Sequence, residues 1–209
     1  MAIISFQHKF IFVKTRKTAS TSIEIHLAAF CGHKDIITTI YPPHSGHFPQ
    51  NFQSEGGFIY FNHMSASVIL NRLPDAFSTS FKFCFERHPV DKCLSHFSMQ
   101  KNSIYHADPN NPKTWTEYLE RGEFPIDTSS YVDDHSNIIV DKIYRYEELG
   151  AAMKDIALRT GVPYRPLLVR EKSGYRIGVP SFDQVMGNPA ERRRIFEAFE
   201  SSLKFTPYA

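Results

Sequence analysis

The sequence predicts an α/β fold, with a mostly parallel central sheet of roughly four or five strands between two layers of helices. Two observations lead to this prediction. Four short segments are near-continuously apolar and rich in aromatic and β-branched residues, as strands covered on both faces are. These segments alternate along the chain with helical patterns, which is typical of parallel strands joined by crossover helices. We therefore expect ligands to bind beyond the carboxyl ends of the strands.

The elements follow in chain order. The predicted strands are residues 10–14, 57–62, 81–86 and 138–146, and the predicted helices are residues 20–31, 65–72, 90–101, 115–121, 147–160 and 189–204. Three segments rich in Pro, Gly, Ser or other polar residues interrupt this pattern, at 41–57, 102–113 and 121–137. Loops of this length in a compact domain are either functional or mobile, so we expect them beside a binding site.

The composition is that of an ordinary globular protein. With 209 residues, 42% of them hydrophobic and 22% charged, the chain can bury one substantial core, and we expect a single domain spanning residues 1–209. The net charge of +2 argues against nucleic acid or another bulk polyanion as a partner, but it leaves room for a local basic pocket.

Several features favour a cytoplasmic protein. The first residues lack a basic segment followed by a long apolar run, and no apolar run approaches the roughly 20 residues of a membrane helix. The cysteines Cys31, Cys84 and Cys93 do not have metal-ligand spacing. We interpret them as free thiols in a reducing compartment.

The turn after the first predicted strand has the character of a phosphate site. Its sequence, KTRKTASTS at positions 14–22, leads from an apolar strand through small and hydroxylated residues into a helix. Such a helix start offers unpaired backbone N–H groups and the positive end of the helix dipole, and Lys17 adds a point charge. The hydroxyls that can donate to a phosphate are those of Thr18, Ser20, Thr21 and Ser22.

A simpler interpretation of this turn is helix capping, with Ser20 or Thr21 as the N-cap.

The turn is not the P-loop of nucleoside-triphosphate enzymes. It has no glycine, its lysine precedes the small residues, and no clear strand-ending Asp is available to hold Mg²⁺. Because alanine disfavours a positive φ, we expect Ala19 to keep φ below zero.

A second candidate anion site follows the predicted strand 81–86, in the sequence FKFCFERHPVDKCLSHF. Arg87 offers a rigid fork of donors that fits a phosphate bidentately, and Pro89 suits the first turn of a helix. Ser95 lies about two helical turns further on. The simpler interpretation is a surface arginine and a solvated serine.

Together the two motifs resemble those of the sulfotransferases that use 3′-phosphoadenosine 5′-phosphosulfate, closest to the carbohydrate-type branch with its P-loop-like fold. The resemblance implies that residues 17–22 (Lys17, Thr18, Ala19, Ser20, Thr21 and Ser22) hold the 5′-phosphosulfate. It implies that Arg87 and Ser95 hold the 3′-phosphate. The chain departs from the family pattern at Arg16, where proline is usual, at Ala19, where glycine is usual, and at His88, where Asp or Asn is usual.

The resemblance continues over most of the chain. The segment DKIYRYEEL resembles the family's strand ending in Arg-x-Glu-x-Leu, and the last residues resemble its closing helix. The segment VREKSGYRIG resembles the part that closes over the nucleotide. The resemblance implies that Lys172, Ser173 and Arg176 contact phosphate or ribose.

The chemistry that the resemblance implies is in-line sulfuryl transfer to a hydroxyl or amine, with 3′,5′-adenosine bisphosphate as the second product. Positioning and charge stabilisation dominate such a reaction, so no metal is required. Lys17 is expected to stabilise the charge that builds on the leaving phosphate. His63, just beyond the predicted strand 57–62, is the candidate general base, and its simpler interpretation is a packing histidine.

Other residues compete for the role of base. His44 and His47 lie in the first long loop, in a spacing that also suggests a metal but without an obvious third ligand, and Glu86 is better explained as a structural carboxylate. The three loops are expected to line the acceptor side, where a carbohydrate, glycolipid or small metabolite would bind. The loop residues that could contact it are Tyr41, Phe48, Tyr105, Tyr131, Asp133 and Asp134.

Two other functions stay open at this point. An ATP-dependent small-molecule kinase on a related fold would bind ATP with Mg²⁺. A non-catalytic protein that binds a nucleotide or a sulfated glycan would show binding without turnover.

Overall fold

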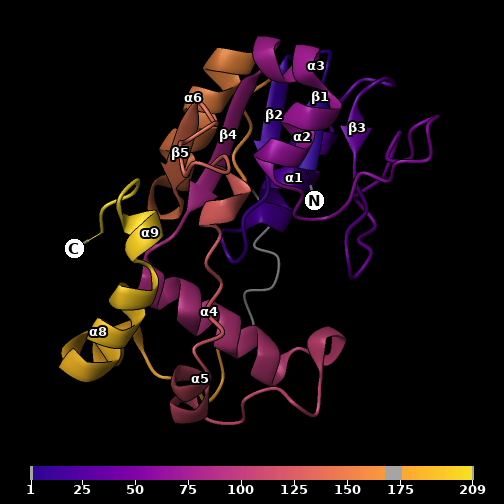
Figure 1. Ribbon diagram of the computed structural model, residues 1–209. Coiled ribbons are helices and arrows are strands. Elements are labelled where there is room, and N and C mark those ends of the chain that lie inside the picture. Colours follow the sequence, from indigo (N-terminus) through magenta and orange to yellow (C-terminus); the bar gives the residue numbers. More distant parts are fainter. Residues whose placement is uncertain (1, 168–175, 209) are drawn as a thin grey trace. The chain divides into compact units, whose positions relative to one another are not determined.

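The computed structural model describes residues 2–167 and 176–208 (Figure 1). The chain forms two compact units, one of residues 1–86 and 127–170 and the other of residues 87–126 and 171–209. We call them the sheet unit and the helical unit. The single domain expected from the chain length stays a prediction.

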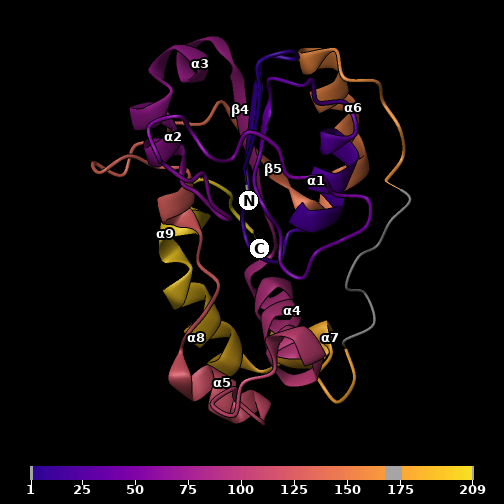
Figure 2. The same cartoon turned by 90° about the vertical axis from the view of Figure 1, so that its right-hand side faces the viewer.

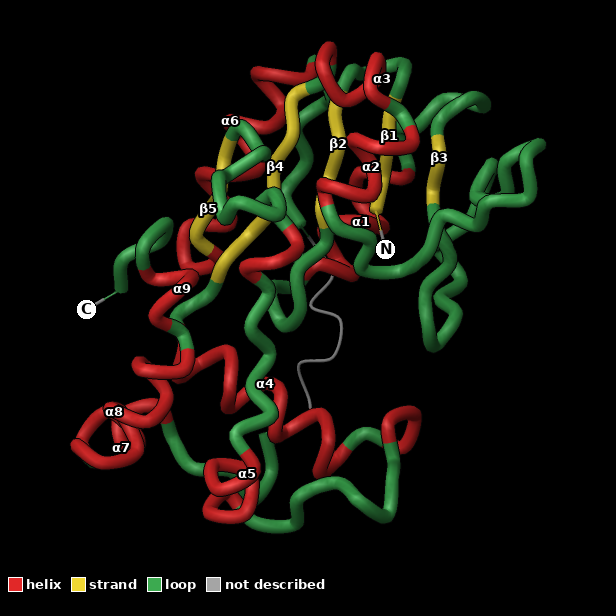
Figure 3. Tube along the Cα trace, viewed as in Figure 1, coloured by secondary structure: helices red, strands yellow, loops and turns green. Residues whose placement is uncertain are grey.

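The sheet unit is built on a five-stranded sheet in the order β3-β1-β2-β4-β5 (yellow in Figure 3). Its strands are β1 (Ala2–Ser5), β2 (Phe10–Val13), β3 (Ile36–Ile37), β4 (Phe81–Glu86) and β5 (Lys142–Arg145). Strands β2, β4 and β5 run parallel, whereas β1 pairs antiparallel with both β2 and β3. The α/β class is confirmed, but the sheet is mixed, and the prediction of a mostly parallel sheet was wrong.

The reason for the mixed sheet lies in its first connection. Only four residues separate β1 from β2, and Ser5 pairs with Phe10 across this turn. Parallel neighbours need a crossover of a dozen or more residues, so a connection this short joins antiparallel strands. The sequence analysis missed β1, although each of its four residues is buried.

Three of the predicted strands contain β2, β4 and β5, but residues 57–62 do not form a strand. This segment makes a single isolated bridge, between Gln53 and Ile59. Ile59 and Phe61 are 55% and 46% exposed and only Tyr60 is buried, so the segment is not covered on both faces as a buried strand would be.

Helices cover both faces of the sheet within the sheet unit (Figure 2). Helix α1 (Ser20–Ala28) and helix α6 (Leu149–Thr160) lie on one face, and α2 (Ala66–Arg72) and α3 (Pro74–Thr79) lie on the other. The core under α1 and α6 is aromatic, and the rings of Phe12 and Phe83 stack at 5.5 Å. Two short 3-10 turns, η2 (Thr128–Ser130) and η3 (Tyr146–Glu148), complete the unit.

The helical unit has its own core. Its helices are α4 (Pro89–Asn102), α5 (Trp115–Arg121), α7 (Phe182–Gly187), α8 (Pro189–Ala198) and α9 (Glu200–Leu203), with a 3-10 turn η1 (Ile104–His106). Val90, Phe97, Tyr118, Ile195 and Phe199 are among the buried residues of this core. The predicted helix 189–204 is divided at Phe199 into α8 and α9, and α3 and α7 were not predicted.

No helix in the described part of the chain is long and apolar enough to cross a membrane. The three cysteines are free thiols, and Cys84 and Cys93 are buried. Burial raises the pKa of Cys93 to about 12, so this thiol stays protonated and is a packing residue rather than a nucleophile.

Candidate functional site

The parallel strands place the predicted phosphate-binding turn at the expected edge. Because β2, β4 and β5 are parallel, their carboxyl ends share one edge of the sheet. The turn of residues 14–19 leaves β2 at this edge and enters α1. The hydroxyl of Thr15 donates to the carbonyl oxygen of Phe85 in β4, so the start of the turn is anchored to the neighbouring strand.

The turn has an unusual backbone for its sequence. Lys17 has φ 63 and Ala19 has φ 56, so two non-glycine residues out of three are left-handed. The expectation that Ala19 would keep φ below zero was wrong. A left-handed L-residue costs roughly 1–2 kcal/mol, so the surrounding contacts outweigh the local preference of Ala19.

Helix α1 begins without a capping side chain. Its N-cap is Ala19, whose methyl group cannot accept a hydrogen bond, and the prediction of Ser20 or Thr21 as N-cap was wrong. Ser20 and Ser22 are buried in the first turn of the helix. The first amides of a helix have no intrahelical acceptor, so an uncapped start of this kind suits an anion.

The threonines of the turn face inward. Thr18 is fully buried, and its hydroxyl lies 3.0 Å from that of Thr15. The Thr18 side chain therefore stabilises the turn from its buried side, through its contact with Thr15. Of the hydroxyls that the sequence offered to a phosphate, only that of Thr21 belongs to a half-buried residue.

His63 lies beside this turn and is held by it. Its Nδ1 is 3.1 Å from the carbonyl oxygen of Lys14. A carbonyl only accepts, so Nδ1 carries the hydrogen and Nε2 keeps its lone pair. Burial lowers the pKa of His63 to about 3, with a further lowering by the Lys14 ammonium, while the Asp127 carboxylate opposes the shift. The imidazole is thus neutral at physiological pH.

A buried charged group lies at the other end of Lys14. Its Nζ is 3.4 Å from Glu24 Oε2 and 3.4 Å from Thr21 Oγ1, and His47 Nε2 is 3.5 Å from Glu24 Oε1. Glu24 is fully buried in α1. This carboxylate links the end of β2, the helix α1 and the long loop 41–57. His47 therefore has a structural partner, and His44 Nδ1 accepts from the backbone N–H of Gly46.

Arg16 stands where the sulfotransferase pattern usually has proline, and it has a specific partner in the structure. Its backbone N–H donates to Asp127 Oδ2 at 2.7 Å, and its Nε donates to Asp127 Oδ1 at 2.8 Å. Asp127 is buried, with 4% of its surface exposed. The carboxylate fixes the residue that precedes the left-handed Lys17.

The second predicted site belongs to the helical unit. Arg87 is buried, and its Nε donates to Asp91 Oδ2 at 2.7 Å. The Arg87 and Arg176 Nη2 groups also pair with Asp91. Burial alone would raise the pKa of Asp91, but the two guanidinium groups outweigh it and hold the pKa below its usual value. Arg87 and Arg176 therefore converge on one anionic group, as they would on a phosphate.

The surroundings of His88 explain why a histidine can stand where the sulfotransferase pattern usually has Asp or Asn. His88 is the N-cap of α4, and its ring packs against those of Phe182, Phe196 and Tyr208 at 4.8, 5.7 and 5.4 Å. Its role is aromatic packing. Pro89 occupies the first turn of α4, as predicted.

The remaining predicted residues are placed as follows. Ser95 is half-buried on α4, and Lys172 and Ser173 lie outside the described residues. Tyr131 is fully buried, so it does not line an acceptor site; burial and the nearby Glu86 carboxylate raise its pKa. Tyr41, Phe48 and Tyr105 are 65%, 74% and 51% exposed and can contact a ligand.

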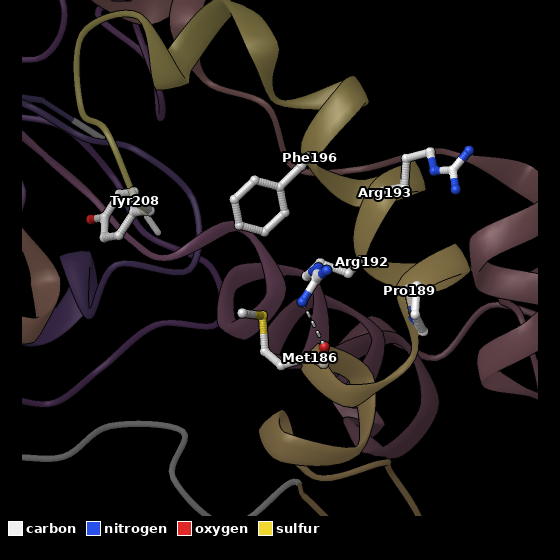
Figure 4. A pocket seen from close by; sticks show the side chains of 6 residues that line it. All are labelled: Met186, Pro189, Arg192, Arg193, Phe196 and Tyr208. Atoms are coloured by element: carbon white, nitrogen blue, oxygen red, sulfur yellow. Dashed lines mark hydrogen bonds between the residues drawn. The ribbon is translucent and has the colours of Figure 1, made fainter.

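The helical unit also has an open pocket of about 460 Å³ around the start of α8 (Figure 4). Arg192 donates to the carbonyl oxygen of Met186, and Phe196 points into the space between α8 and Tyr208. None of the predicted site residues lines this pocket. Its full lining is Met186, Pro189, Arg192, Arg193, Phe196 and Tyr208.

The structure thus groups the predicted residues in two sets. Lys17 and His63 belong to the sheet unit, where His63 bonds to the carbonyl of Lys14, three residues before Lys17. Arg87, Ser95 and Arg176 belong to the helical unit. Among the residues described, no cluster of three or more His, Cys, Asp or Glu side chains could hold a metal. No protein-family model matches the chain, and no curated protein matches it significantly.

Sequence reasoning missed Glu24 and Asp127 as members of the first set, and it gave Lys14 no role. A glutamate in the helical run IEIHLAAF reads as a solvated position, and only its neighbours in space show that it is buried. Asp127 lies 111 residues from Arg16, so no local signal connects them.

Proposed function

We propose that this chain is a sulfotransferase that transfers the sulfuryl group of 3′-phosphoadenosine 5′-phosphosulfate to a hydroxyl or amine of an acceptor, on a P-loop-like three-layer arrangement. The observation that carries the proposal is the turn of residues 14–19. It combines left-handed Lys17 and Ala19, an uncapped start of α1, and a histidine with a fixed tautomer next to it. The motif resemblance to the sulfotransferase family supports the same function.

Each part of the turn has a role in the proposed reaction. The first amides of α1 bind the 5′-phosphate, since the N-cap Ala19 has no side chain that could accept from them. Lys17 stabilises the negative charge that develops on the oxygen between sulfur and phosphorus. In the helical unit, Arg87 and Arg176 bind the 3′-phosphate in place of Asp91.

The reaction balances without a further reactant. The acceptor oxygen forms a bond to sulfur, the bond from sulfur to the bridging oxygen breaks, and 3′,5′-adenosine bisphosphate leaves with the electron pair. The acceptor proton passes to Nε2 of His63. A weak base suffices, because the acceptor hydroxyl becomes strongly acidic as its oxygen bonds to sulfur. The low pKa keeps His63 neutral at physiological pH, although it makes the imidazole a weaker base than one that titrates near neutrality.

Two measurements test the proposal. Calorimetric titration with 3′,5′-adenosine bisphosphate should show saturable binding that does not need Mg²⁺. Transfer of labelled sulfate from the donor to a panel of glycans, lipids, phenols and amines should give a labelled product. Absence of both binding and transfer would contradict the function.

The variant His63→Asn tests the base. Asparagine accepts a left-handed backbone and can donate to the Lys14 carbonyl as Nδ1 does, but it cannot take up the proton. We expect the transfer rate to fall roughly 10²–10⁴-fold while bisphosphate affinity is unchanged. An unchanged rate would remove His63 from the reaction.

A further inference from the structure

Asp127 makes two hydrogen bonds to the turn of residues 14–19, although neither motif includes it. Both of its carboxylate oxygens accept from Arg16, one from the backbone N–H at 2.7 Å and one from Nε at 2.8 Å. The carboxylate is buried, and a buried charge is retained only where it is paired and hydrogen-bonded. The pair therefore restrains both the backbone and the side chain of Arg16.

The restraint acts next to the residues whose backbone conformation is energetically least favourable. The residue after Arg16 is left-handed Lys17, and left-handed Ala19 follows two positions later. Such a backbone persists only when its surroundings over-determine it. Thr15, anchored to the Phe85 carbonyl, fixes one side of Arg16, and Asp127 fixes Arg16 itself.

Asp127 also acts on the candidate base. Its negative charge is among the groups that act on His63, where it favours the protonated imidazole and so opposes the effects of burial and of Lys14. A single carboxylate thus bears on the conformation of the Lys17 turn and on the proton affinity of His63.

We propose that Asp127 is a positioning residue that holds the turn of residues 14–19 in the conformation that binds a 5′-phosphosulfate. The ligand class rests on the proposed function, whereas the hold on the turn does not. Asp127 replaces, by a long-range contact, the conformational restraint that a proline at position 16 supplies in the family pattern.

The structure offers a control aspartate for this proposal. Asp141 also bonds to the backbone and side chain of one residue: its Oδ2 accepts from the Lys82 backbone N–H at 2.7 Å and lies 2.9 Å from Lys82 Nζ. Asp141 precedes β5 and bonds near the start of β4, at the edge of the sheet away from the turn. Its side chain is 45% exposed, against 5% for Asp127, so Asp141→Ala controls for the loss of an aspartate that bonds a strand residue, without touching residues 14–19.

The experiment compares Asp127→Ala, Asp127→Asn and Asp141→Ala with the unchanged chain. Hydrogen exchange of the amides of residues 16–22 is measured without ligand, and affinity for 3′,5′-adenosine bisphosphate by calorimetry. Kinetics with the sulfate donor give kcat and KM. We expect Asp127→Ala to exchange at least tenfold faster in this segment and to raise the bisphosphate Kd and the donor KM at least tenfold. Asp127→Asn should fall between, because its amide oxygen still accepts from the Arg16 N–H.

The outcomes separate the two proposals. If the unchanged chain neither binds the bisphosphate nor transfers sulfate, the proposed function fails, and hydrogen exchange alone decides the role of Asp127. If Asp127→Asn and Asp127→Ala exchange and bind no differently from Asp141→Ala, the positioning role is wrong. Should Asp127→Ala fail to fold, the isosteric Asp127→Asn carries the same comparison.

Discussion

The turns after β2 and β4, which carry the two candidate anion sites, are built differently. The turn after β2 places Lys17 on a left-handed backbone, and its helix starts at an alanine without a side-chain cap. The turn after β4 is conventional: Pro89 begins α4, and the cation Arg87 is paired within one helical turn by Asp91. The first turn is therefore distinguished by its backbone conformation, and the second by an ion pair that is already formed without a ligand.

This difference predicts two kinds of sensitivity. The shape of the first turn depends on distant residues, Asp127 above all, so variants far along the sequence should disturb it. The second turn depends on local charge, because Asp91 pairs with both Arg87 and Arg176, and under the proposed function a phosphate would take its place. Variants there should change affinity without changing the backbone.

Of the differences expected between the two turns, the largest is at the first. Lys17→Ala should fold and bind 3′,5′-adenosine bisphosphate, but transfer sulfate roughly 10²–10³-fold more slowly, because the charge on the leaving phosphate is no longer stabilised. Single-turnover kinetics measure this loss. The matched control is Lys9→Ala, since Lys9 is also a left-handed lysine, with φ 47, in the turn that enters β2. Equal rates in the two variants would remove Lys17 from the chemistry.

At the second turn the effect should appear in binding. Arg87→Ala should raise the Kd for the bisphosphate by roughly 10–100-fold, because a charge-assisted hydrogen bond contributes about 1.5–3 kcal/mol. Calorimetry measures the change. The control is Arg121→Ala, which breaks another pair of the same spacing, with Glu117, on α5. An affinity loss of the same size in the control would show that the effect is not specific to the anion site.

Next in size is the pH dependence of stability due to His63. Its pKa is about 3 in the folded chain and its ordinary value is 6.5, so the unfolded chain binds the proton first as pH falls. Its neutral form therefore stabilises the fold above pH 6.5, and this contribution is lost progressively toward pH 3. Between these limits His63→Asn should reduce the slope of unfolding free energy against pH by up to about 1.4 kcal/mol per pH unit. Denaturant unfolding at several pH values checks this, and identical slopes would contradict the neutral buried imidazole.

The smallest expected effect is at Ala19. Ala19→Gly should raise the free energy of unfolding by about 0.5–1 kcal/mol, because glycine relieves the left-handed strain but loses more chain entropy on folding. Thermal unfolding should show a rise of about 1–4 °C. The control Ala157→Gly, inside α6, should instead destabilise by about 1 kcal/mol. If Ala19→Gly instead lowers the free energy of unfolding, the Ala19 methyl group makes packing contacts that outweigh the strain.

Local patterns were enough to predict much of the fold. Strands β2 and β4 and helices α1, α4, α5 and α6 have continuous apolar runs or clear helical periodicity, and their bounds lie within a few residues of those expected. Residues 57–62 have the composition of a strand but no neighbour to pair with beyond one bridge, so composition misled there. The direction of β1 depends on a four-residue connection that the sequence analysis did not consider.

The site divides in the same way. The position of the turn follows from sequence order, because it comes directly after β2. His63 does lie beside the turn, but the strand 57–62 that was expected to place it there does not form. The left-handed Ala19 and the buried Glu24 do not follow, since each is set by contacts with residues distant in the chain. Local preference disfavours both, and the tertiary structure overrides it.

The hydrogen bond from His63 to the Lys14 carbonyl has a consequence for motion. The acid–base group and the cation Lys17 are fastened to one short stretch of backbone, three residues apart. A displacement of the strand end therefore moves the anchor of His63 together with the backbone that bears Lys17. For the proposed reaction this means that the surrounding loops could adapt to a bulky acceptor while the candidate base and the candidate charge stabiliser keep a common anchor.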